Sequence, residues 1–462
     1  MTFLDKVGGG LPERYYLGVD IGYKAHVAVV VSLEDFLQSG EGWKKAPFLE
    51  FPSTQAGLEK LQAYLDSYCT HLEVYLGLCE PTGGFYGVTV YRYLLSQGFP
   101  MWWIENSLTR NMREKIFGHI PKTDPMDARV MTRIGYLHEA VGEEFSLRPL
   151  QLARPENREL LQLCRDAWKV KSILTRARNQ FSQLMAVVFP ELKTFFTKSV
   201  SSIAPVTLMH HFPSPVEIAS SPAEDVYDVL WQVGAYHHAK RVDELQQLAR
   251  SSSGVLPDLG RAWRLSWLTD YMLDNFQAKA TLDRYIEERV TSRPEYKLLS
   301  ALPYSSPISL GMIIAATGNV KRFSNYRKYV AYSGYFAGLE TSQTIDRTRM
   351  SKRGNRDLKR TYYQIATPLV WFDPGENPYK ELYQRKMEDG RPWYKAMPFV
   401  CAALARHVYH CLKYEDPYDL TKAFGPSSTP ASETLNVEEA LLSMDLEAKY
   451  DLLNAHLSDP CR

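Results

Sequence analysis

Four carboxylates in the first third of the chain could bind a metal ion together: Asp20, Glu80, Asp124 and Asp127. Hard divalent cations prefer oxygen ligands, and Mg²⁺ is commonly held by a few carboxylates together with phosphate oxygens of a substrate. A purely structural role is the alternative, in which Asp20 and Glu80 stabilise turns and the two later aspartates complement a helix dipole. The residue types alone leave both interpretations open.

A second candidate for chemistry is Ser342, far along the chain. We expect it in a glycine-containing loop within residues 334–360, just ahead of a run of cations that begins at Arg347. A serine hydroxyl is a poor nucleophile until a base, cation or metal activates it, and cations stabilise the charge that gathers on a phosphodiester under attack. A serine without any such role is the alternative. No histidine lies close in sequence, which disfavours a hydrolytic triad.

The cations themselves are suited to binding a polyanion. Between Lys321 and Arg360 there are eleven Lys or Arg against three Asp or Glu, in a chain with a net charge of only +1. Such side chains neutralise phosphates, and Tyr362 and Tyr363 just beyond them could stack on bases. A solvated helix face is the alternative. The candidate nucleic-acid-binding residues are Arg347, Arg349, Lys352, Arg353, Arg356, Lys359 and Arg360.

The elements that carry the carboxylates read as alternating strands and helices. Residues 15–31 predict two strands joined by a tight turn, with Asp20 at the end of the first, and residues 72–79 predict a buried strand that ends at Glu80. Asp124 is predicted as a helix N-cap with Pro125 at the first helical position, which places Asp127 on the same helix face. This pattern predicts an α/β domain.

From Leu160 to Val188 the pattern becomes that of a long helix. Apolar residues recur at spacings of three and four, as in the seam of a coiled coil, and Phe189 and Pro190 end the repeat. We also expect a helix over 226–250, a Ser-rich linker at 251–254 and a second long helix over 258–291. The two long helices either pack antiparallel or pair with another subunit.

The length of 462 residues predicts several domains. We expect an α/β domain at 12–150, a helical coiled-coil region at 151–295, a mostly helical domain at 296–425 and an acidic, mobile tail at 426–462. Hydrophobic residues make up 45% and charged residues 23%, which is typical of globular proteins. No apolar run approaches membrane-spanning length, no signal peptide is evident, and six scattered cysteines lack a CxxC pair. We therefore expect a cytoplasmic protein without disulfides, zinc or membrane contact.

Four stretches taken together resemble a known family. LGVDIG with Asp20, CEPTGGF with Glu80, KTDPMDARV with Asp124 and Asp127, and RTRMSKRGNRDLKR are similar to the DEDD transposases of insertion sequences, serine-dependent recombinases guided by a bridge RNA. The resemblance spans about 15–145 and 297–415. It implies a RuvC-like domain of ribonuclease H fold, in which the four carboxylates bind Mg²⁺, and a C-terminal transposase domain whose serine becomes covalently linked to DNA.

By this resemblance the nucleophile is Ser342, counted from Gly334. The chain departs from the family in having Gln343 after the serine and a shorter segment from there to Met350, so Thr341 is a rival nucleophile. The resemblance also implies the partners: double-stranded target and donor DNA, a structured noncoding guide RNA, and further copies of the chain in a dimer or tetramer.

Three other functions remain open at this point. A RuvC-like metal nuclease would cut and release DNA, with Ser342 as a bystander. LGVDIG is also similar to the phosphate loop of sugar kinases and actin-like ATPases, but no DxGGT or GTG partner follows it. A catalytically silent nucleic-acid-binding protein would use the basic run alone.

Overall fold

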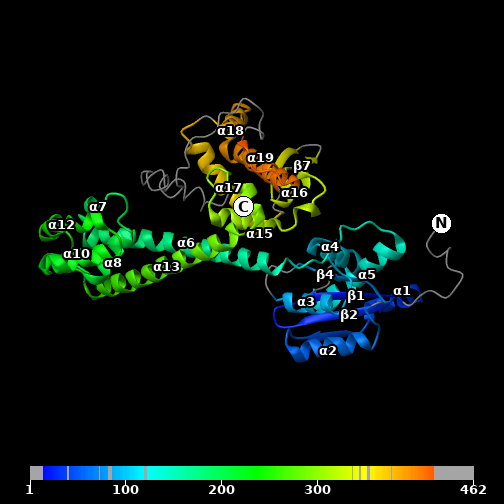
Figure 1. Ribbon diagram of the computed structural model, residues 1–462. Coiled ribbons are helices and arrows are strands. Elements are labelled where there is room, and N and C mark those ends of the chain that lie inside the picture. The colour runs from blue at the N-terminus through cyan, green and yellow to red at the C-terminus, as the bar shows by residue number, and fades with distance from the viewer. Residues whose placement is uncertain are drawn as a thin grey trace. The chain divides into compact units, whose positions relative to one another are not determined.

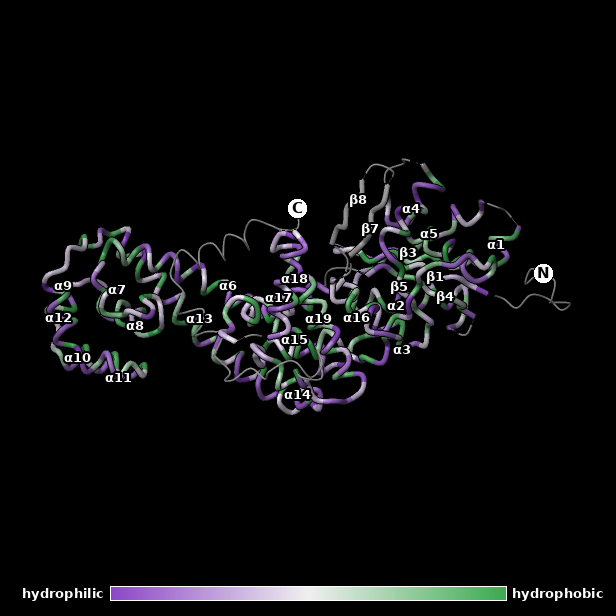
Figure 2. Tube along the Cα trace, turned by 90° about the horizontal axis from the view of Figure 1, so that it is seen from above, coloured by the Kyte–Doolittle hydropathy of each residue, from purple (hydrophilic) through white to green (hydrophobic). Residues whose placement is uncertain are grey.

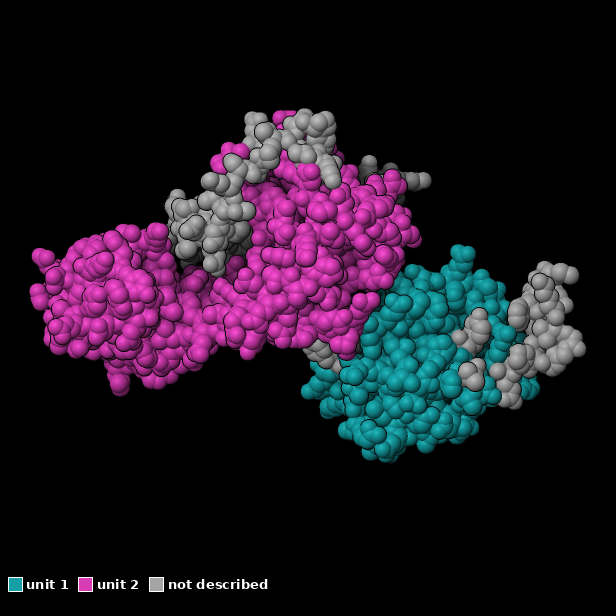
Figure 3. All heavy atoms as spheres, viewed as in Figure 1, with its two compact units in different colours: residues 1–152 teal, residues 153–462 magenta. Residues whose placement is uncertain are grey.

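The structure is a computed structural model that describes residues 14–38, 41–71, 73–81, 86–118, 122–335, 337–342, 345–350, 354–375 and 377–420. Of residue 75 and the two strands within 337–350 it describes the backbone alone. The chain divides into two compact units, Met1–Leu152 and Ala153–Arg462, which are coloured separately in Figure 3. The predicted acidic tail at 426–462 lies outside the described residues. None of the described helices combines the length and apolar character needed to span a membrane.

Unit 1 is built on a mixed sheet, with six strands in the described part of the chain (Figure 1). Its strand order is β3-β2-β1-β4-β5-β6. Strands β1 (Tyr15–Ile21), β2 (His26–Ser32) and β3 (Phe48–Phe51) pair antiparallel, β4 (Val74–Cys79) pairs parallel with β1 and with β5 (Met101–Trp103), and β6 (Arg148–Pro149) closes the edge antiparallel. The first two strands are almost continuously apolar because both faces of the sheet are covered.

Helices bury a separate hydrophobic cluster on each face of this sheet. On one face, Leu17 and Val19 pack with residues of α2 (Gln55–Asp66) and α3 (Val88–Ser96). On the other, Tyr16 and Val29 pack with residues of α1 (Leu33–Gln38) and α5 (Asp124–Tyr136), alongside α4 (Asn106–Phe117). Short helical segments at Gly42–Lys45 and Leu137–Val141 complete the layer. The predicted α/β architecture is therefore confirmed.

A glycine sets the distance between α5 and β1. A Cβ atom on Gly18 would lie 2.1 Å from the backbone oxygen of Ala128, far inside van der Waals contact. Only a residue without a side chain allows the helix to dock this closely on the strand. The contact brings the first turn of α5 to the end of β1, where Asp20 lies.

In unit 2 the two long helices run side by side, as Figures 1 and 2 show. They are α6 (Pro155–Val188) and α13 (Leu259–Thr291). Leu160 near the start of α6 packs in one cluster with Ile286 near the end of α13, and Phe181 packs in another with Leu268. The helices are therefore antiparallel within one chain, which is the first of the two arrangements that the sequence left open.

Short helices lie at the far end of this pair, and here one prediction was wrong. The single helix expected over 226–250 is divided, in a stretch described throughout, among α10 (Ala223–Gln232), α11 (Tyr236–Ala239) and α12 (Val242–Arg250), with Gly234 at a positive φ of 74° in the first break. The remaining helices of this group are α7 (Leu192–Phe195), α8 (Ile203–His211) and α9 (Pro215–Ser220). Apolar spacing continued across the breaks and concealed them.

The Ser-rich stretch at 251–254 connects α12 to α13 (Leu259–Thr291), as predicted, and hydrogen bonds hold it in place. The Glu191 carboxylate accepts hydrogen bonds from the Ser252 hydroxyl at 2.6 Å and from the backbone amide of Ser253 at 2.8 Å. Although burial opposes the charge, these hydrogen bonds lower the pKa of Glu191 to about 2. A Cβ on Gly254 would lie 2.0 Å from the oxygen of Val188, so this glycine too permits a close backbone approach.

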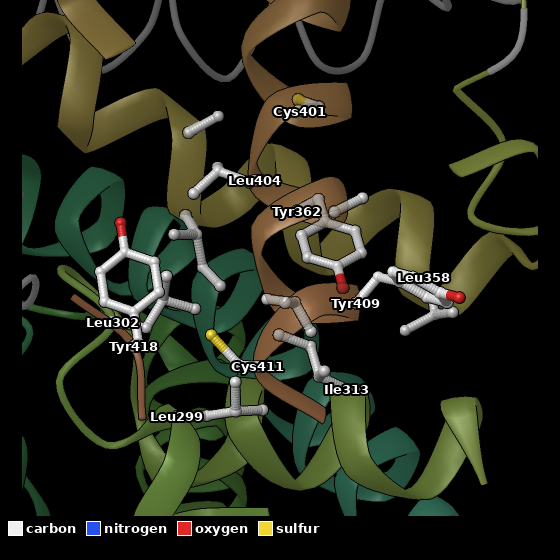
Figure 4. Close-up of a cluster of buried hydrophobic side chains, with 14 of the residues drawn as sticks. Leu299, Leu302, Ile313, Leu358, Tyr362, Cys401, Leu404, Tyr409, Cys411 and Tyr418 are labelled. Carbon is white, nitrogen blue, oxygen red and sulfur yellow. The ribbon is translucent and has the colours of Figure 1, made fainter. Parts of the chain in front are cut away.

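The rest of unit 2 is mostly helical around one core, shown in Figure 4. Tyr362, Leu404 and Tyr409 are buried there among residues of several helices. These helices are α14 (Pro294–Leu299), α15 (Pro307–Thr317), α16 (Tyr326–Tyr332), α17 (Arg356–Trp371), α18 (Pro378–Glu388) and α19 (Trp393–Tyr414), with a short turn at Val320–Arg322. An antiparallel hairpin of β7 (Ala337–Ser342) and β8 (Ile345–Met350) precedes α17.

Candidate active site

Two of the predicted carboxylates lie side by side at one edge of the sheet of unit 1. Asp20 is near the end of β1 and Glu80 directly follows β4, and these neighbouring parallel strands are in register at Val19 and Cys79. Because carboxyl ends of parallel strands meet at the same edge, the two acids leave the sheet together. Both are buried, with exposed fractions of 7% for Asp20 and 9% for Glu80.

The two aspartates of α5 differ from one another. Asp127 is 2% exposed and lies in the first turn of the helix that docks on β1, whereas Asp124 is exposed. The helix begins at Asp124, and Thr123 is the N-cap without a side-chain hydrogen bond. The predicted N-cap was therefore wrong by one residue, and so was the place of Pro125, which is the second helical residue and not the first.

The carboxylates share one electrostatic environment. The pKa of Asp20 is raised to about 7, chiefly by burial and also by the negative charges of Asp124, Asp127 and Glu80, against the lowering effect of Lys122. Burial also raises the pKa of Glu80, with a contribution from Asp127. The fold therefore collects negative charge at this edge and makes the ionised state of Asp20 unfavourable, which is a common property of functional sites.

Two cationic side chains contact the innermost acid. Arg113 of α4 donates a hydrogen bond to Asp127, and the Lys122 ammonium lies 3.3 Å from the other oxygen of the same carboxylate. Although burial opposes its charge, the carboxylates of Asp127 and Asp20 raise the pKa of Lys122. Sequence reasoning missed Lys122 as a member of the site, although its position just before Asp124 was a usable signal.

The donor set fits a hard divalent cation. All the candidate ligands are carboxylates, and a bound cation would relieve the mutual repulsion that raises the pKa of Asp20. As the side chains stand, no group of three or more His, Cys, Asp or Glu in the described part of the chain is arranged as a metal site. Lys122 and Arg113 supply the positive charge instead.

Removing Lys122 should therefore raise the pKa of Asp20 above about 7. In Lys122→Gln the Asp20 carboxyl loses a cation that lowers its pKa, so its titration moves to higher pH. Carboxyl-carbon chemical shifts followed by NMR from pH 5 to 9 measure this directly. Lys115→Gln, at an exposed lysine on α4, is the matched control and should leave the titration in place. An unchanged Asp20 titration in Lys122→Gln would show that the ammonium does not act on this acid.

The candidate nucleophile Ser342 and the cations that follow it lie in unit 2. Ser342 is the last residue of β7 and pairs with Ile345, and Thr341 pairs with Asp346. The expected loop is therefore a strand end within a β-hairpin. The side chains of Ser342 and Thr341 lie outside the described residues, and so do those of Arg347 and Arg349 on β8. Lys352 and Arg353 fall entirely outside the described part of the chain.

The described cations lie on the first turns of α17, and they are not equivalent. Arg356 is exposed, whereas the Arg360 guanidinium lies 4.4 Å from the ring centroid of Trp168 on α6. Asp357 between them binds Arg165 of α6 at 2.7 Å. Arg360, itself exposed, thus contributes to packing α17 on α6, and Lys359 is half-buried.

Two glycines hold the start of α17 against the residue that precedes the hairpin. Gly334 and Gly354 both have positive φ, 83° and 110°, and a Cβ on Gly354 would lie 2.6 Å from the Cα of Gly334. Positive φ with so close an approach is open to glycine alone. The chain segments before and after the hairpin that carries Ser342 therefore lie next to each other at these two glycines.

Comparison with known proteins gives a match in each of the two regions, the one with the four carboxylates and the one with Ser342. A family model described as transposase, of the DEDD type of IS110, matches residues 17–190, and a second model, described as the transposase IS116/IS110/IS902 family, matches residues 296–381. No curated protein gives a significant match. The first match contains Asp20, Glu80, Asp124 and Asp127, and the second contains Ser342. Together the matches cover more than half of the 462 residues, and the chain belongs to the IS110 family of transposases.

Proposed function

We propose that this transposase is a DNA recombinase that cuts and rejoins strands through a covalent phosphoserine intermediate, with Ser342 as the nucleophile and Mg²⁺ held by Asp20, Glu80, Asp124 and Asp127. The observation that carries the proposal is the shared environment of the four acids, in which the pKa of Asp20 rises to about 7. Membership of the family supports DNA transposition as the overall activity. The antiparallel β1–β3 followed by parallel β4 and β5 supports a RuvC-like, ribonuclease H fold for residues 12–150.

The chain's own residues have defined tasks in this reaction. The bound Mg²⁺ would supply Lewis-acid polarisation of the scissile phosphate and neutralise its charge. The Ser342 oxygen forms a bond to phosphorus, the bond from phosphorus to a deoxyribose oxygen breaks, and that oxygen leaves with a proton as a free hydroxyl. Attack of a second strand's hydroxyl on the phosphoserine reverses these events and frees the serine. One phosphodiester is exchanged for another, so the reaction needs no ATP.

We assign the transposase domain to residues 296–425. Its cations would hold the DNA strand near Ser342. Arg356 and Lys359 are available for phosphate contact on α17, and the proposal adds Arg347, Arg349, Lys352, Arg353 and Arg360 to them. Such contacts bind the backbone regardless of sequence. Sequence choice is proposed to come from base pairing with a structured guide RNA, since a protein that reads a duplex by shape and charge needs few base contacts.

Trapping the intermediate tests the proposal. DNA with a nick close to the cleavage site loses a short fragment after attack, so the protein should remain attached to DNA in denaturing gels. Mass spectrometry of the digested adduct should find the nucleotide on the peptide that contains Ser342. Free DNA ends without any adduct would instead establish a metal-dependent nuclease, the second candidate, which the placement of all four acids within unit 1 favours. Recombination that persists after the RNA is removed would refute guidance by RNA.

A further inference from the structure

Two exposed tyrosines meet at the edge of the sheet where Asp20 and Glu80 lie. Tyr23 is 76% exposed in the turn between β1 and β2, and Tyr86 is 47% exposed in the connection between β4 and α3. Their ring centroids are 5.1 Å apart and their planes are at 82°, an edge-to-face pair. Each tyrosine thus follows, along the chain, one of the two buried acids at the ends of neighbouring strands.

The backbone beneath both rings is held in place. A Cβ on Gly22 would lie 2.2 Å from the oxygen of Ala25, so the turn that carries Tyr23 is tight. The Ser53 hydroxyl donates to the backbone oxygen of Tyr86 at 3.3 Å and is also hydrogen-bonded to Nε2 of the buried His26. His26 starts β2 opposite Ile21 at the end of β1, so these contacts anchor Tyr86 to the edge that carries Asp20.

A second set of contacts ties the same connection to Glu80. The Tyr91 hydroxyl donates to the backbone oxygen of Glu80 at 3.0 Å. Its ring also fills the space beside Gly87, where a Cβ would lie 2.4 Å from the Cζ atom of Tyr91. One residue of α3 therefore positions both the backbone of the acid and the segment that begins with Tyr86. The tyrosine pair has a defined place relative to the acids.

Neutral aromatic rings can bind DNA at this edge of the sheet without pairing with the carboxylates. A cluster of carboxylates repels a DNA backbone, and an added cation would pair with the acids, as Lys122 does with Asp127. A neutral ring binds the face of a nucleobase by stacking and leaves the carboxylates available. Inside a duplex both faces of a base are already stacked, so such a ring would receive a base that has left its helix.

We propose that Tyr23 and Tyr86 form a binding subsite for an unpaired nucleobase of the DNA strand that is cut. This proposal rests on the proposed function, which identifies the bound strand as DNA. It adds a requirement that the phosphate chemistry alone does not have: the base next to the scissile phosphate is unstacked when the strand is held.

Binding of fluorescent oligonucleotides to the full-length protein tests the subsite. Tyr23→Ala should weaken binding of single-stranded DNA roughly 5- to 100-fold, the range expected for loss of one stacked base, while duplex affinity changes less than about twofold. Tyr23→Phe should retain the affinity, because stacking needs the ring and not the hydroxyl. Tyr236→Ala is the matched control, since Tyr236 is also an exposed tyrosine in an edge-to-face pair, with Trp231, but lies on α11 in unit 2.

A second measurement, the fluorescence of an unpaired base, tests stacking directly and not through affinity. A 2-aminopurine placed in an unpaired stretch of the DNA should be quenched on binding wild-type protein and less quenched by Tyr23→Ala and Tyr86→Leu. Unchanged quenching and affinity in both variants would overturn the subsite, as would an equal loss for duplex and single strand. A loss confined to single-stranded RNA would overturn its assignment to DNA. Asp20→Asn should keep the quenching, so a failure of the proposed chemistry is distinguished from a failure of the subsite.

Discussion

Ser342→Ala is expected to abolish the covalent protein–DNA adduct and with it all strand joining. The hydroxyl oxygen is the atom that forms the bond to phosphorus, and alanine offers no replacement, so the loss should reach on the order of 10³-fold or more. DNA binding should persist, because the cations of α17 and the carboxylates of unit 1 are untouched. Adduct formation on nicked DNA, compared with binding of the same DNA, measures both quantities.

Thr341→Val is the matched variant for this experiment. It removes the neighbouring hydroxyl at an adjacent position of β7 and changes the side-chain volume little, so it should keep the adduct. Full adduct in Ser342→Ala together with none in Thr341→Val would transfer the nucleophile to Thr341. If both single variants still form the adduct, the proposal that a hydroxyl of β7 is the nucleophile is refuted.

Asp20→Asn is expected to reduce strand cleavage by on the order of a hundredfold or more and to stabilise the metal-free protein at high pH. The pKa of Asp20 in the folded protein, about 7, exceeds its ordinary value of 3.8. Between these values the folded state binds more protons than the unfolded state, so the free energy of unfolding falls as the pH rises toward 7. Above pH 7 the destabilisation is complete, with an upper bound of about 4 kcal/mol.

Thermal unfolding without metal, at pH 5 and pH 8, checks this sign. The difference should favour the asparagine variant at both values and be larger at pH 8, because pH 5 lies between the two pKa values and pH 8 lies above both. Added Mg²⁺ should raise the midpoint of the wild type at pH 8 and have less effect on the variant, because binding to the folded state alone stabilises it. Glu50→Gln, at an exposed acid on β3, is the control without either effect. A wild type that is more stable than Asp20→Asn at pH 8 without metal contradicts the raised pKa of Asp20.

Local patterns in the sequence predicted most of the elements that carry the site. Short apolar runs predicted β1, β2 and β4, and hence Asp20 and Glu80 at strand ends. The apolar repeat from Leu160 predicted α6 and its end before Phe189. These predictions succeeded because strand and helix periodicity depends on near neighbours in the chain. The helix expected over 226–250 failed for the same reason, since the repeat continued across breaks that the packing imposes.

Contacts between distant residues were decided by the tertiary structure alone. The docking of α5 on Gly18 buries Asp127 near the end of β1, and the engagement of Arg360 by Trp168 takes a predicted phosphate ligand partly into packing. The sequence by itself determined which residue types were present for metal, phosphate and base contact, and on which kind of element most of them lie. Only the fold decided which acids are buried, which cations contact them and that Tyr23 meets Tyr86, because burial and charge interaction depend on distances across elements that no local pattern encodes.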